Sequence, residues 1–119
     1  MLRSQGIIIV IALVLTLTAC GKRLKTEDAA LIASARTGHA GTVRDMIASG
    51  ANVNVKEEHG NTALIEAARN GHDDVVRTLL AAGADFKAKN DDGKTALMLA
   101  AQGGHEDVVR ALREAGALE

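Results

Sequence analysis

The sequence has 119 residues and is 47% hydrophobic, but it contains one Phe and no Trp, Tyr or Pro. Aromatic rings usually supply much of the buried area of cores and interfaces, so a core built on large rings and an RNA-stacking platform are both excluded. The balance of 14 basic to 15 acidic residues excludes a strongly basic nucleic-acid-binding surface. The single Cys excludes an intramolecular disulfide and a cysteine-clustered metal site. We expect small helices packed closely through Ala and Leu.

The start of the chain has the pattern of a secretory signal. Residues 7–17 are apolar and uncharged, follow Arg3 and precede small residues. A transmembrane helix is the competing interpretation, but a span needs roughly 20 apolar residues. Because this run has only 11 residues, the pattern favours a cleaved signal peptide over residues 1–19.

The four residues from Leu17 to Cys20 resemble the bacterial lipobox. The resemblance implies that the Cys20 thiol carries diacylglycerol, that cleavage occurs before Cys20, and that the new amino terminus is acylated. Two or more acyl chains attach a protein stably to a membrane. The alternative is a free Cys buried at the end of a signal or anchor helix. The resemblance predicts a periplasmic lipoprotein, and Gly21, where Asp would signal inner-membrane retention, favours the outer membrane.

Residues 20–26 form a short basic tether that includes Lys22, Arg23 and Lys25. These cations either contact anionic lipid headgroups or remain in solvent. From Glu27 onward the balance is 10 basic to 15 acidic residues. The folded part is therefore predicted to be acidic.

An internal repeat organises residues 27–119. Residues 60–84 and 93–117, related by a shift of 33, are identical at 16 of 25 positions. A 33-residue period indicates stacked helical repeats, here in units 27–56, 57–89 and 90–119. The shared pattern G-x-T-A-L-x-x-A-A-x-x-G-H resembles the ankyrin repeat. The resemblance implies an all-α ankyrin-repeat solenoid of three helix-turn-helix units.

Local chemistry predicts where the helices begin and end. Thr62 and Thr95 are placed to accept a backbone N–H as N-caps of the first helix in their units. Gly71 and Gly104 follow these helices and are expected to adopt positive φ. An acidic pair such as Asp73-Asp74 then suits the positive end of the second helix dipole.

The sequence contains no motif for catalysis or for metal binding. His39, His72 and His105 recur every 33 residues, and helices packed about 8–10 Å apart keep such residues from sharing a zinc ion at about 2.0–2.1 Å. We therefore expect a scaffold role for all three. Paired acids are sequence neighbours, and neither a phosphate-binding loop nor a serine nucleophile motif is present. The prediction is a protein without enzymatic activity, metal or cofactor.

The resemblance implies that a partner protein contacts the turn tips and the exposed face of the first helices. The positions it assigns to this contact are Arg36, Glu58, His59, Asn61, Arg69, Asn70, Asp91, Asp92, Lys94 and Gln102. Their variation between units fits a contact role, but it also fits solvent-facing positions that vary freely. His59 is either a contact or a solvated loop residue. Glu66, which replaces Ala33 and Leu99, either extends to solvent at a helix edge or reaches a basic group of the partner.

The sequence as a whole predicts a monomeric, membrane-anchored protein-interaction module on the periplasmic side of a bacterial membrane, with no nucleic acid among its partners. One version of its role is an inhibitor or immunity protein that neutralises an envelope-attacking enzyme. Another is a scaffold for a periplasmic enzyme. A third, a weak hydrolase or enzyme accessory, is disfavoured because the sequence shows no nucleophile and no metal site.

Overall fold

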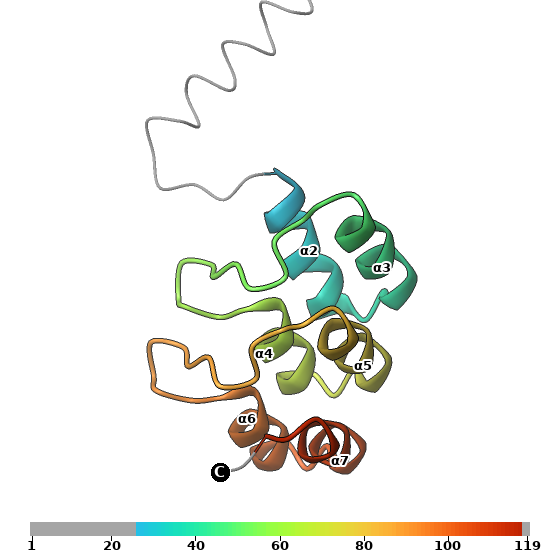
Figure 1. Cartoon of the computed structure of the whole chain (residues 1–119). Coiled ribbons are helices and arrows are strands. Elements are labelled where there is room, and N and C mark those ends of the chain that lie inside the picture. The colour runs from blue at the N-terminus through green and yellow to red at the C-terminus, as the bar shows by residue number, and fades with distance from the viewer. Residues whose placement is uncertain (1–25, 118–119) are drawn as a thin grey trace, which may run out of the picture.

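The computed structural model describes residues 26–117, which form six helices and no strand. The helices are α2 (Thr26–Thr37), α3 (Ala40–Ala48), α4 (Ala63–Arg69), α5 (Asp73–Ala81), α6 (Ala96–Gln102) and α7 (Glu106–Glu114). They pair into three stacked helix-turn-helix units (Figure 1). The predicted all-α repeat fold is confirmed. Within residues 26–117, no helix is long and apolar enough to cross a bilayer.

The helices form two layers. Helices α2, α4 and α6 pack against one another in one layer, and α3, α5 and α7 form the other. Two long connections extend sideways from the layer of α2, α4 and α6 (Figure 1). We call residues 50–62 the first finger and residues 83–95 the second finger. Because the fingers project beyond the helices, they give the molecule a surface that the helical layers alone would lack.

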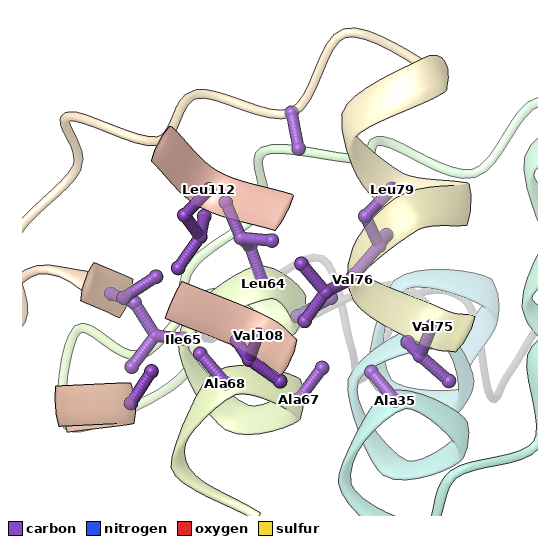
Figure 2. Close-up of a cluster of buried hydrophobic side chains, with 14 of the residues drawn as sticks. Ala35, Leu64, Ile65, Ala67, Ala68, Val75, Val76, Leu79, Val108 and Leu112 are labelled. Atoms are coloured by element: carbon purple, nitrogen blue, oxygen red, sulfur yellow. The ribbon is translucent and has the colours of Figure 1, made fainter. Parts of the chain in front are cut away.

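A continuous core runs through all three units. Its fully buried large side chains include Leu31, Leu64, Val76, Leu79 and Leu112, which come from both layers. Figure 2 shows the last four of these. Burial of each such side chain stabilises the fold by about 1.5–3 kcal/mol. Buried alanines lie between them, and their small side chains let the helices approach closely. The buried alanines of the core are Ala35, Ala63, Ala67, Ala68, Ala84, Ala96, Ala100, Ala111 and Ala117.

The predicted helix boundaries are confirmed for α4 and α6. The Thr62 hydroxyl accepts a hydrogen bond from the backbone N–H of Ile65 at 3.1 Å, and the Thr95 hydroxyl accepts one from the N–H of Met98 at 3.3 Å. Gly71, just beyond α4, has a φ of 75°. This left-handed conformation ends the helix, and glycine adopts it at little steric cost because it has no Cβ atom. The chain then turns directly into the second helix of the unit.

Each finger closes on itself through backbone hydrogen bonds. In the first finger the N–H of Glu57 donates to the carbonyl of Asn61, and the N–H of Gly60 donates to the carbonyl of Glu57, both at 2.9 Å. In the second finger the N–H of Asn90 donates to the carbonyl of Lys94 at 3.0 Å. The two tips therefore share one turn geometry and present their side chains in the same register.

Candidate functional site

A hollow of about 550 Å³ lies where the two fingers meet α2 and α4. Its lining residues are Arg36, Glu57, His59, Asn61, Glu66, Arg69, Asn70, Asn90, Asp91 and Asp92. Seven of the ten positions predicted for partner contact are among them. Glu58, Lys94 and Gln102 lie outside this lining, and the Lys94 ammonium donates a hydrogen bond to the Gln102 side-chain oxygen at 3.0 Å. The register of the repeat therefore brought most of the predicted residues to one place.

Glu66 is the most buried charged residue of the hollow, with 3% of its surface exposed. One carboxylate oxygen accepts from the Arg36 Nε at 3.1 Å, and the other accepts from an Arg69 terminal nitrogen at 3.3 Å. Both interpretations of Glu66 from the sequence are wrong. The carboxylate neither extends to solvent nor is available to a partner, because arginines from two neighbouring units occupy both of its oxygens.

Arg36 links three elements at this point. Besides the bond to Glu66 of α4, its guanidinium donates to a Glu57 carboxylate oxygen of the first finger at 2.8 Å. The hydrogen bond that Arg36 donates to Glu66, with the negative charges of Glu66 and Glu57, raises the pKa of the Arg36 guanidinium above its ordinary value. Arg36 is in α2, so this one side chain fixes the positions of α2, α4 and the first finger relative to one another.

Asn61 requires a correction, because it is 4% exposed and its side chain bonds within the protein. Its amide oxygen accepts from Arg69 at 3.3 Å and from the Asn90 amide at 3.0 Å. Its amide nitrogen donates to Glu57 at 3.1 Å. The Asn61 side chain is therefore part of the scaffold that joins the two fingers and not an exposed contact.

The second finger holds two exposed carboxylates against the hollow. The Asn90 side-chain oxygen accepts from the backbone N–H groups of Asp92 and Lys94, both at 3.0 Å. The N–H of Asp91 donates to the carbonyl of His59 at 3.0 Å. A Cβ atom on Gly60 would lie 2.6 Å from a carboxylate oxygen of Asp91. Gly60 therefore permits the two tips to lie in direct contact.

Two of the recurring histidines join successive units. The His72 Nε2 donates to the carbonyl of Arg36 at 2.9 Å, and the His105 Nε2 donates to the carbonyl of Arg69 at 3.0 Å. His39 instead lies with its Nδ1 2.7 Å from the Thr37 hydroxyl. The scaffold role predicted for His72 and His105 is confirmed. No group of three or more His, Cys, Asp or Glu within residues 26–117 could hold a metal ion.

Two residues of the hollow, Glu57 and Asn90, were missed from the sequence, and Glu66 was considered there without its two arginine partners. Glu57 and Asn90 resemble ordinary turn residues. A signal for Glu66 was present, since it lies three residues before Arg69, a spacing at which helix side chains meet. Arg36 occupies in the first unit the position that Arg69 occupies in the second unit. A second arginine close to Glu66 was therefore also to be expected. Cys20, the predicted lipidation site, lies outside the described residues.

A family model described as ankyrin repeats, in three copies, matches residues 8–90 and 31–118. No curated protein matches the sequence. The number of copies agrees with the three helix pairs in the stack.

Proposed function

Because the chain belongs to the ankyrin-repeat family, whose repeats generally mediate protein–protein interaction, we propose that it binds a partner protein through the hollow and the two finger tips. The observation that carries this proposal is the preformed network of Arg36, Glu66 and Arg69 with Asn61. These side chains hold one another in place through hydrogen bonds within the chain. Binding at such a surface loses less conformational entropy than binding at a mobile one.

The proposed contact surface consists of the exposed residues that line the hollow. These are Arg36, His59, Arg69, Asn70, Asp91 and Asp92. Three repeats offer about 600–1,000 Å² to a partner, near the 800 Å² per side of a standard interface. Such a surface is large enough for specific recognition of one protein without an aromatic anchor from this chain.

The proposed location is the periplasmic face of a bacterial membrane, with the outer membrane favoured. The support for it is the lipobox-like sequence that ends at Cys20. A lipid anchor would confine the protein to a surface and raise its local concentration near a partner on the same membrane. A modest binding surface would gain most from this effect.

The binding proposal is tested by filling the hollow without changing its charge. The tagged wild-type chain is used to capture a partner from membranes of the cells that express it, and the partner is purified and rebound. The exposed His59 is then changed to Trp. We expect His59→Trp to weaken rebinding at least tenfold, because the indole occupies space that the partner would enter.

The matched control is Thr42→Trp, which places the same side chain on an exposed position of α3 in the opposite layer. It should leave rebinding within about twofold of the wild type. Equal weakening by both variants, or weakening by Thr42→Trp alone, would contradict the proposed binding face. Arg69 is not a suitable site for charge reversal, because a carboxylate there would lie beside Glu66 and disturb the fold.

The anchor is tested with Cys20→Ser. We expect the wild-type chain to incorporate a labelled fatty acid and to partition with membranes, and the variant to lose both the label and cleavage before residue 20. Mass spectrometry of the amino terminus reads both events. A processed, lipid-free amino terminus on a membrane-attached wild-type protein would refute lipidation. Gly21→Asp should keep the label while moving the protein towards the inner membrane.

A further inference from the structure

We propose that the hollow binds a positively charged segment of the partner protein, an extended stretch with at least two Lys or Arg side chains. This inference rests on the proposed function, since it names the chemistry of what binds at the same site. It combines two independent observations. The family match points to a protein ligand, and the arrangement of charges around the hollow points to the sign of that ligand's charge.

The two cations of the hollow are already occupied by the protein's own acids. Arg36 bonds to Glu66 at 3.1 Å and to Glu57 at 2.8 Å. Arg69 bonds to Glu66 at 3.3 Å and to the Asn61 amide oxygen at 3.3 Å. An anionic ligand would have to compete with these internal acceptors. The two arginines are therefore poor evidence for a negatively charged partner.

The carboxylates of the second finger are in the opposite situation. Asp91 and Asp92 are both exposed, and within residues 26–117 their carboxylates form no ion pair. Their backbone N–H groups bond to the His59 carbonyl and the Asn90 side chain, which fixes the tip but leaves the carboxylates open. Two fixed negative charges thus face the hollow without a counter-charge from this part of the chain.

The charges that line the hollow sum to a negative value. Four carboxylates (Glu57, Glu66, Asp91 and Asp92) face two guanidinium groups (Arg36 and Arg69), which gives a net charge of −2 with His59 neutral. None of the four lysines of the fingers, Lys56, Lys87, Lys89 and Lys94, is among the residues that line the hollow. The Lys56 ammonium donates to the Lys89 carbonyl at 3.1 Å, and the Lys94 ammonium donates to Gln102. Complementary potentials steer association and select partners, so a basic segment fits this surface best.

The experiment uses the full chain in a neutral detergent and two fluorescein-labelled octapeptides, (Gly-Lys)₄ and (Gly-Glu)₄. Anisotropy at low salt should show binding of the lysine peptide and none of the glutamate peptide. Because exposed charges are screened by salt, binding should weaken at least threefold between 20 and 200 mM NaCl. Absence of lysine-peptide binding, or equal binding of both peptides, would overturn the inference.

The site of binding is tested by removing the same number of charges at two places. Asp91→Asn with Asp92→Asn should weaken lysine-peptide binding at least threefold. The control is Glu106→Gln with Asp107→Asn in the first turn of α7, outside the lining of the hollow, and it should change binding by less than twofold. Equal weakening by the two pairs would mean that only net charge matters, which contradicts a site at the hollow. Asp92→Asn alone, at an exposed lining position, supplies a smaller neutralisation at the hollow if the aspartate pair folds poorly.

Two further arms separate this inference from its alternatives. Calcium at 1 mM should not displace the peptide beyond the effect of an equal ionic strength of NaCl, and stronger displacement would indicate a metal site instead. The captured partner should also rebind less tightly to the Asp91→Asn, Asp92→Asn variant. If His59→Trp blocks rebinding while this variant does not, the proposed function stands and the basic-segment inference fails.

Discussion

Replacing both Arg36 and Arg69 with Ala should lower the free energy of unfolding by about 3–5 kcal/mol, a typical cost of leaving a buried charge without its partner. The reason is Glu66, which is 3% exposed and has its two carboxylate oxygens bonded to these arginines. Without them the carboxylate loses both of its counter-charges at a position that the fold keeps largely buried. Urea denaturation followed by circular dichroism measures the loss.

Adding Glu66→Leu to the double variant should recover most of the lost stability, because a well-packed apolar residue can replace a buried ion pair at little cost. Leucine is a reasonable choice, since Leu99 occupies the equivalent position in the third unit. If the triple variant is as unstable as the double variant, the cost comes from lost packing of the arginine stems and not from the stranded carboxylate.

The matched control for this prediction is Arg77→Ala with Arg110→Ala, in the layer formed by α3, α5 and α7. Arg77 pairs with Asp73 at 3.0 Å and Arg110 pairs with Asp107 at 3.7 Å, and all four side chains are at least 33% exposed. Exposed ion pairs contribute about 0–1 kcal/mol each. The control variant should therefore lose much less stability than the variant without Arg36 and Arg69, although each variant lacks two arginine side chains.

The helices and their order could be predicted because their signals are local. Thr62 and the N–H that it caps are three residues apart, and Gly71 lies two residues after the end of the helix that it terminates. A fixed 33-residue period then repeats these signals and gives the stacking. The caps and turns are determined by interactions within one unit, so the sequence of that unit is enough to reveal them, and comparison of the units reveals the period.

The interior of the candidate site could not be predicted in the same way, because several of its bonds join different units. The Arg36–Glu66 pair spans 30 residues, and the Asn61–Asn90 bond spans 29. Repeat register predicted which positions face the hollow, and seven of ten do line it. Register does not say which of these side chains face solvent and which bond to each other. That distinction decided the outcome for Asn61 and Glu66.

The second large effect is expected for Gly71→Ala, which should lower the free energy of unfolding by about 1.5–3.5 kcal/mol. Gly71 has a φ of 75°, and a left-handed backbone costs a residue with a Cβ about 1–2 kcal/mol. The new Cβ would also lie 2.5 Å from the His105 Nδ1. The ring must move, which breaks its 3.0 Å bond to the Arg69 carbonyl, worth about 0.5–1.5 kcal/mol.

Gly104→Ala separates these two contributions. Gly104 has nearly the same φ, 72°, but a Cβ there would meet no atom within 4 Å. It should therefore show the backbone cost alone, about 1–2 kcal/mol. In a His105→Ala background, Gly71→Ala should cost no more than Gly104→Ala does in the wild type. If it still costs as much as in the wild type, the histidine does not couple the second and third units, and the whole effect of Gly71→Ala arises within its own turn.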